Sequence, residues 1–203
     1  MGERLPRAFF ARPTLEVARA LLGARLVHRE ADGARVSGII LETEAYIGEE
    51  DQGCHARAGR TRRTAVMYGP PGHAYIYFTY GMHWLFNVVT EAEGFPAAVL
   101  VRALWPEEGL ARMAERRAPR PRSAWTDGPA KLCQALGIDG RYHGLDLCAP
   151  DAPLFIETAY TFPPESVTTG PRVGLNTVPE PWKSIPWRFR VRPEALQRLR
   201  EAP

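Results

Sequence analysis

The stretch AYIYFTYGMHWLFNVVT (residues 74–90) decides the fold, because it predicts two aromatic β-strands joined by a short turn. Residues 74–80 and 84–90 are rich in β-branched and aromatic side chains, which favour strands. Gly81 lies between them, so we expect a β-hairpin whose tip is Tyr80-Gly81-Met82-His83.

Strand alternation assigns the side chains of this hairpin to two faces. Tyr75, Tyr77 and Thr79 are expected on one face. The other face is expected to hold Ile76, Phe78 and Tyr80.

The segments on either side of the hairpin predict further strands and a few short helices. Strands are expected at residues 24–30, 35–46, 97–104, 153–157, 171–175 and 187–192. Helices are expected at 14–22 (with Thr14 as the N-cap), 107–117, 128–136 and 193–201, and residues 47–73 are expected to form a long loop. The strands mostly follow one another directly. We therefore expect an α+β fold with a curved, mainly antiparallel sheet flanked by helices, in one domain over residues 1–203.

The composition is that of a folded protein and excludes several classes. Of 203 residues, 45% are hydrophobic and 24% are charged. Apolar runs are too short to cross a bilayer, and no secretory signal is evident, so we expect a cytoplasmic protein, associated with the nucleoid if bacterial. The three cysteines are far apart and no metal-binding spacing is present. We expect no metal, no organic cofactor and no membrane contact.

The basic residues are nearly all arginine. Only Lys131 and Lys183 are lysines among 26 basic residues, and the net charge is +3. Arginine suits phosphate groups because its planar guanidinium donates two parallel hydrogen bonds. A GC-rich genome or a hot habitat explains the same bias, so the composition alone leaves both readings open.

The segment Glu42-Thr43-Glu44-Ala45-Tyr46 places two carboxylates and a tyrosine on one face of a predicted strand. A carboxylate held beside an aromatic wall is a common arrangement for a general base. The alternative is an edge strand with solvated glutamates.

Four arginines lie within residues 57–63, on a glycine-containing loop that also holds His55. They are Arg57, Arg60, Arg62 and Arg63. Such a loop can bind phosphates, and His55 can donate a hydrogen bond to a base. The alternatives are a solvated basic loop and a structural histidine.

The aromatic hairpin offers two groups that could handle a nucleotide. Tyr80 at the tip, beside Gly81 and Met82, can wedge between base pairs, and Tyr77 can stack on an extruded base. The alternative is that these tyrosines are ordinary core residues. The N-terminus of the helix that begins after Gly128 can attract phosphate, and Lys131 in its first turn would add positive charge. The alternative is a capped surface helix with one lysine.

An ordered set of motifs resembles the alkyladenine DNA glycosylase family, also called the 3-methyladenine or methylpurine DNA glycosylases. The motifs are Glu42-Thr43-Glu44-Ala45-Tyr46, Gly59-Arg60-Thr61, Tyr75-Ile76-Tyr77, Tyr80-Gly81-Met82-His83, Asn87-Val88-Val89, Val101-Arg102-Ala103 and residues 128–136. They cover residues 13–192. Cys54 and Thr64 depart from the residues that this family usually has at these places.

The resemblance implies a catalytic set. Glu44 matches the general base that accepts a proton from the attacking water. Arg102 matches an arginine that helps to hold that water, and the backbone carbonyl of Val173 matches a further water contact.

The resemblance also implies how the substrate is held. Tyr46 and Tyr77 match residues that stack on the two faces of a flipped base, His55 lies at its edge, and Asn87 matches a residue that excludes normal guanine. The residues expected to contact DNA are the plug Tyr80 with Gly81 and Met82, and the phosphate contacts Arg57, Arg60, Arg63 and Lys131.

The expected function is therefore base-excision repair. A monofunctional glycosylase without lyase activity, acting as a monomer on duplex DNA, would hydrolyse the N-glycosidic bond of alkylated purines such as 3-methyladenine and 7-methylguanine. Hypoxanthine and ethenoadenine stay open as substrates. Two rivals remain: a noncatalytic nucleic-acid-binding module, and a hydrolase of free nucleosides.

Overall fold

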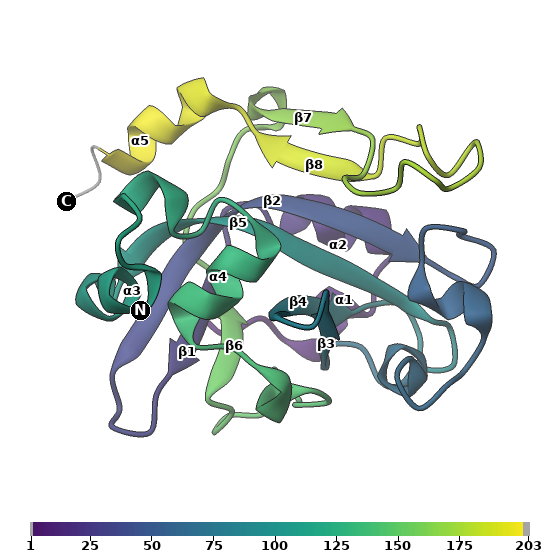
Figure 1. Cartoon of the computed structure of the whole chain (residues 1–203), viewed down its shortest axis with the longest axis horizontal. Coiled ribbons are helices and arrows are strands. Elements are labelled where there is room, and N and C mark those ends of the chain that lie inside the picture. Colours follow the sequence, from purple (N-terminus) through teal and green to yellow (C-terminus); the bar gives the residue numbers. More distant parts are fainter. Residues whose placement is uncertain (1, 201–203) are drawn as a thin grey trace.

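The computed structural model describes residues 2–200, and its strands form one eight-stranded sheet (Figure 1). The main path runs β3-β4-β5-β2-β1-β6, β8 pairs with a separate part of β2, and β7 pairs with β8. Every strand pairing is antiparallel. The strands are β1 (Arg25–Arg29), β2 (Arg35–Ile47), β3 (Ala74–Thr79), β4 (His83–Val89), β5 (Ala97–Glu108), β6 (Leu154–Glu157), β7 (Val167–Gly170) and β8 (Arg188–Val191).

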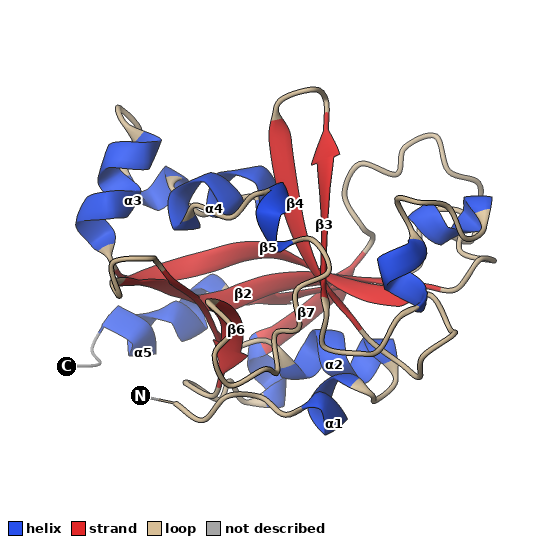
Figure 2. Ribbon diagram, turned by 90° about the horizontal axis from the view of Figure 1, so that it is seen from below, coloured by secondary structure: helices blue, strands red, loops and turns tan. Residues whose placement is uncertain are grey.

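Helices cover both faces of the sheet (Figure 2). Figure 2 shows α3 and α4 on one side, α1 and α2 on the other, and the β3–β4 hairpin projecting on the side of α3 and α4. The helices are α1 (Arg7–Phe10), α2 (Thr14–Ala20), α3 (Leu110–Arg117), α4 (Pro129–Leu136) and α5 (Gln197–Arg200). Within residues 2–200, no helix combines the length and the apolar character needed to cross a bilayer.

The main core fills the space between the sheet and these helices. Val17 and Leu21 pack from the α2 side, and Leu132 and Leu136 of α4 pack from the other, and all four are buried. Phe86 of β4 is completely buried in the same core, so the base of the projecting hairpin is fixed by packing.

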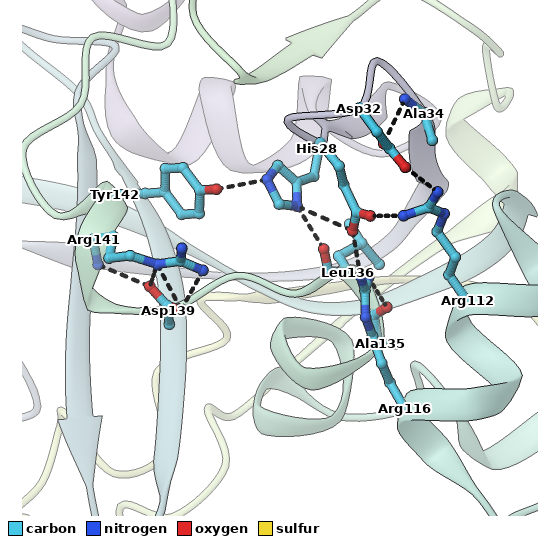
Figure 3. A network of polar contacts seen from close by, with 11 residues as sticks. His28, Asp32, Ala34, Arg112, Arg116, Ala135, Leu136, Asp139, Arg141 and Tyr142 are labelled. Atoms are coloured by element: carbon cyan, nitrogen blue, oxygen red, sulfur yellow. Dashed lines mark hydrogen bonds and ion pairs between the residues drawn. The ribbon is translucent and has the colours of Figure 1, made fainter.

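A polar network fastens α3 and α4 to the end of β1 (Figure 3). Nδ1 of His28 lies 2.7 Å from the carbonyl oxygen of Leu136, and Nε2 lies 2.7 Å from the hydroxyl of Tyr142. Burial lowers the pKa of His28, so the neutral ring donates to Leu136 and accepts from Tyr142. Glu30 adds ion pairs to Arg112 and Arg116 of α3. The network holds in place the helix that supports the hairpin.

The tip of the hairpin is a tight turn with left-handed backbone. The amide of Met82 donates to the carbonyl of Thr79 at 3.2 Å, and φ is 51° at Tyr80 and 68° at Gly81. Two positive φ angles give the type I′ twist that suits a two-residue connection. Tyr80 therefore leaves the strand alternation, and its side chain is 88% exposed.

Several predicted elements differ from the structure. The predicted strand 171–175 is wrong: the strand is β7, and Val173-Gly174 form a turn. The predicted helix 107–117 begins at Leu110, because β5 continues to Glu108 and Gly109 has a φ of 70°. The predicted loop 47–73 contains two 3₁₀ helices, His55–Ala58 and Ala65–Tyr68.

The terminal helices also differ in detail. Thr14 is the first residue of α2 and Pro13 precedes it, so Thr14 is not the N-cap; its hydroxyl donates to Glu91 at 2.8 Å. The predicted helix 193–201 is a 3₁₀ turn at Pro193–Leu196 followed by α5, and residue 201 lies outside the described residues.

Replacing Phe86 by alanine tests the packing at the base of the hairpin. We expect Phe86→Ala to lower the free energy of unfolding by about 3–5 kcal/mol, because it leaves a large cavity in the core. The matched control is Phe78→Ala, since Phe78 is 46% exposed, and it is expected to cost about 1 kcal/mol or less. Urea unfolding measures both, and equal losses would contradict this packing.

Candidate active site

A cavity of about 240 Å³ lies between β3 of the hairpin, β5 and the segment after β7. It is lined by most of the residues that the sequence predicted for catalysis and base binding. These are Tyr46, His55, Tyr77, Tyr80, Asn87, Arg102 and Val173. The fold therefore brings together β2, the loop after β2, the β3–β4 hairpin, β5 and the segment after β7.

The hairpin contributes three residues of one strand face to this cavity. Tyr75, Tyr77 and Thr79 all line it, as the alternation predicted. Tyr80 was predicted on the opposite face, but it lines the same cavity. The positive φ of Tyr80 ends the alternation and accounts for this difference.

Glu44 lies directly behind the wall of the cavity. Its side chain is completely buried, and three donors reach it. The amide of Val173 donates to Oε1 at 2.7 Å, the hydroxyl of Tyr46 donates to Oε2 at 2.9 Å, and Nη1 of Arg102 lies 3.2 Å from Oε2. All three donors belong to residues that line the cavity, so the carboxylate is one layer from it.

Arg102 also separates the two carboxylates of β2. Its Nε donates to Glu42 at 3.0 Å while its Nη1 donates to Glu44. Arg188 and Arg190 of β8 lie 3.8 and 3.9 Å from the carboxylate of Glu42. The repulsion expected between the two glutamates is therefore offset by cations on both neighbouring strands.

Opposing effects act on the pKa of Glu44. Burial is the largest and raises the pKa, because the charged form is desolvated. Arg102, the Val173 amide and the Tyr46 hydroxyl lower it, and Glu42 raises it further. The net pKa is above the usual value for glutamate, which makes the carboxylate a stronger base than a solvated one.

His55 lines the cavity and contacts three neighbouring side chains. Its Nδ1 lies 2.9 Å from the hydroxyl of Tyr75, its Nε2 lies 3.4 Å from Arg63, and its ring meets the ring of Tyr77 edge-on at 4.5 Å. A guanidinium can only donate, so the proton of the neutral ring lies on Nδ1. Burial, then Arg63 and Arg57, lower the pKa of His55 to about 4.

Asn87 lines the cavity and is held there by Tyr75. Its Nδ2 donates to the carbonyl of Tyr75 at 2.9 Å, and its side chain is buried. Tyr75 was not among the predicted site residues, yet it holds both Asn87 and His55. Its shared strand face with Tyr77 was the signal in the sequence.

Of the predicted DNA contacts, Tyr80 lines the cavity and the others do not. Met82 is 68% exposed at the hairpin tip, and Arg57, Arg60 and Arg63 are exposed on the loop after β2. None of these three arginines forms an ion pair with a described residue, while Arg57 donates to the carbonyl of Gln52 at 3.1 Å and Arg63 lies 3.4 Å from Nε2 of His55. Lys131 pairs with Asp127 at 2.9 Å and lies in α4. The structure thus does not gather these cations at one point.

Sequence reasoning missed one buried ion pair beside the cavity. Arg172 contacts Asp51 through two hydrogen bonds of 2.5 and 2.7 Å, and both side chains are completely buried. Arg172 precedes Val173, which was predicted, but nothing in the sequence indicated its partner. Among residues 2–200, no group of three His, Cys, Asp or Glu side chains is arranged to hold a metal.

Comparison with known proteins identifies the family. The family model described as methylpurine-DNA glycosylase matches residues 8–195. The chain belongs to this family. A Myxococcus xanthus relative is 49% identical over 188 residues, covering 93% of this chain and 90% of its own. Relatives from Chlorobaculum parvum (46% identical, 92% and 86% covered) and Methanocella arvoryzae (47%, 91% and 90%) are similar. All three carry the name "Putative 3-methyladenine DNA glycosylase".

Membership of the methylpurine-DNA glycosylase family confirms the coarse prediction made from the motifs. It implies a base-excision repair hydrolase that acts on the N-glycosidic bond of a DNA substrate. The cavity with Glu44 behind its wall is the candidate site for that reaction.

The titration of His55 tests the electrostatics of the cavity edge. We expect its NMR pH titration to have a midpoint near 4, and Arg63→Gln to raise that midpoint because a neighbouring positive charge is removed. Lys183→Gln, on the exposed segment before β8, is the control and should leave it unchanged. A wild-type midpoint at the ordinary value of about 6.5 would contradict the described environment.

Proposed function

We propose that this protein is a monofunctional glycosylase that everts an alkylated purine nucleotide from duplex DNA and hydrolyses its N-glycosidic bond, leaving an abasic site. The substrates would be lesions of the 3-methyladenine and 7-methylguanine class. We assign the activity to one domain over residues 1–203. The observation that supports this most directly is the buried Glu44 behind a cavity walled by Tyr46 and Tyr77.

The proposed chemistry is attack by one water molecule on C1′ of the everted nucleotide. Arg102 and the backbone carbonyl of Val173 would hold the water at the wall of the cavity, and Glu44 would accept its proton. Positive charge that develops on the sugar would be stabilised by the same carboxylate. The pKa of Glu44, raised by burial, suits this role, because a stronger base accepts the proton more readily.

The tyrosine walls would favour alkylated purines. Alkylation at N3 or N7 gives the purine a positive charge, which improves it as a leaving group. A cation between tyrosine faces gains on the order of 1 kcal/mol from cation–π attraction. Asn87, fixed by Tyr75, would stand against the exocyclic amino group of a normal guanine. Hypoxanthine and ethenoadenine lack the positive charge and would depend on stacking alone.

The hairpin tip would enter the duplex. Tyr80 is 88% exposed, lines the cavity and lies in the tight turn of a hairpin that is fixed in the core by Phe86. A rigid side chain of this kind can fill the space left by an everted base. Gly81 and Met82 would enter the duplex beside it. Arg57, Arg60, Arg63 and Lys131 would bind phosphates of the DNA backbone, and the protein would act as a monomer.

The placement of the lysines supports a glycosylase without lyase activity. The chain has only two lysines, Lys131 and Lys183, and neither lines the cavity. A lyase reaction through a Schiff base needs an amine at the sugar.

Glu44→Gln tests the proposed base. We expect it to bind duplex DNA containing 7-methylguanine as the wild type does, and to release the base about 100- to 10,000-fold more slowly under single-turnover conditions. Glu50→Gln, an exposed neighbour in the next loop, is the matched control and should release the base normally. Base release by Glu44→Gln near the wild-type rate would refute this role.

Tyr80→Ala tests the proposed wedge. We expect weaker binding of the lesion duplex and slower base release, while release from a single-stranded substrate changes little, because no stack needs filling there. Phe95→Ala removes another exposed aromatic, away from the hairpin, and serves as the control. The assays are fluorescence of 2-aminopurine next to the lesion and single-turnover release; unchanged values for Tyr80→Ala would remove the wedge.

A further inference from the structure

Burying the ion pair Asp51–Arg172 costs desolvation free energy, and the packing of the main core does not require this pair. The guanidinium of Arg172 makes two hydrogen bonds to Asp51, and both side chains are completely buried. Desolvating such a pair often costs as much as the attraction returns, so an apolar pair of similar size would hold the fold as well. The pair therefore calls for a role other than stability.

Asp51 ties this pair to the strand that carries Glu44. Its carboxylate also accepts the amide of Ile47 at 3.2 Å and the amide of Gly53 at 2.8 Å, which fixes the turn immediately after β2. Nη1 of Arg172 donates to the carbonyl of Ala45 at 3.0 Å, the residue next to Glu44. Arg172 is therefore bonded to β2 at the residue next to Glu44, the proposed base.

Arg172 is also the anchor of the segment that covers Glu44. Between Pro171 and Arg188 it is the one buried residue, and this segment contains no helix or strand. Its neighbour Val173 donates its amide to Oε1 of Glu44 at 2.7 Å. Without the anchor, nothing buried within residues 171–188 would hold that amide against the carboxylate.

The same guanidinium supports a second donor to Glu44. Its central carbon lies 4.7 Å from the ring centroid of Tyr46 and 5.1 Å from that of Trp187. Tyr46 donates its hydroxyl to Oε2 of Glu44 at 2.9 Å. Two of the three donors to Glu44 are therefore positioned by contacts with Arg172.

We propose that Asp51 and Arg172 are positioning residues, whose ion pair holds the Val173 amide and the Tyr46 hydroxyl on Glu44 so that its carboxylate is ionised and aimed at the water. The proposal rests on the role of Glu44 given under the proposed function. Neither residue touches the substrate in this account. Their effect is exerted through the two donors.

The sign of the expected pH effect follows from the donors. Hydrogen bonds to the ionised form lower the pKa of a carboxyl group, so releasing the Val173 amide and the Tyr46 hydroxyl raises the pKa of Glu44. Base release needs the ionised form, so the acid limb of its pH profile must move to higher pH. The other charged or titratable groups around Glu44 are Glu42, Tyr77, Arg102 and Arg188, and they are unchanged.

The test uses a double variant that keeps the protein folded. Asp51→Leu/Arg172→Met removes both charges together, which leaves no unpaired ion in the interior. Arg172→Lys keeps the charge but cannot make the paired contact with Asp51. The control is Arg35→Met, which breaks an ion pair to the buried Glu157, 2.7 Å away at the far end of β2.

Two readouts are measured on each variant. The first is single-turnover release of 7-methylguanine from duplex DNA as a function of pH, and the second is the NMR titration of the Glu44 carboxyl carbon in the DNA-free protein. We expect both variants at residue 172 to show a higher pKa of Glu44, an acid limb moved to higher pH, and a plateau rate lower by roughly ten- to a hundredfold. The control should match the wild type in both readouts.

One result would overturn the proposal. It is a double variant with the wild-type free energy of unfolding, the wild-type pKa of Glu44 and the wild-type rate of base release. A wild-type protein that releases no purine would instead refute the proposed function. In that case the NMR titration still decides whether Arg172 sets the ionisation of Glu44.

The single substitution Gly53→Ala tests the position of Arg172 in a second way. A methyl group at Gly53 would lie 2.6 Å from Leu175 Cδ1 and 2.9 Å from Nη2 of Arg172, so Gly53→Ala must displace one or both. We expect it to move the titration of Glu44 in the same direction as the double variant. No movement, with Arg172 visibly displaced in a crystal structure of the variant, would contradict the proposal.

Discussion

The structure depends on burying the carboxylate of Glu44 among enough hydrogen-bond donors that it can still ionise. Glu44 is completely removed from solvent, and desolvating an unpaired carboxylate would be prohibitive. Three donors offset this, and they come from β2 (Tyr46), β5 (Arg102) and the turn after β7 (Val173). The antiparallel sheet is the device that brings these three segments to one carboxylate.

The same geometry combines a buried site in the interior with an exposed hairpin tip. The hairpin β3–β4 is fixed at its base by Phe86 and by α4, while Tyr80 and Met82 at its tip are exposed. The face of β3 that holds Tyr77 continues from the tip to the cavity wall. Tyr75, Tyr77 and Thr79 therefore link the exposed tip to the cavity along one face of β3.

Much of this could be predicted from the sequence, and the misses have physical causes. The aromatic hairpin, β1, β2 and α4 follow from local patterns of alternation, glycine and proline. The strand assigned to 171–175 failed because Val173 and its neighbours are held by a distant partner, Asp51, through Arg172, and no local pattern reports such a contact. Tyr80 was placed on the wrong face because a positive φ at a non-glycine residue is not visible in the sequence. Glu44 and Arg102 were predicted as site residues from motifs, but the hydrogen bond between them is seen only in the structure.

The most direct measurement is a crystal structure of the protein with duplex DNA that carries a cationic analogue of the abasic sugar. The account predicts that the everted sugar occupies the cavity and that a water lies between its anomeric position and Glu44, within about 2.6–3.2 Å of a carboxylate oxygen. Tyr80 would fill the gap in the duplex. A complex in which the sugar is bound elsewhere, or in which Glu44 stays sealed from any water by the Val173 amide and the Tyr46 hydroxyl, would contradict it.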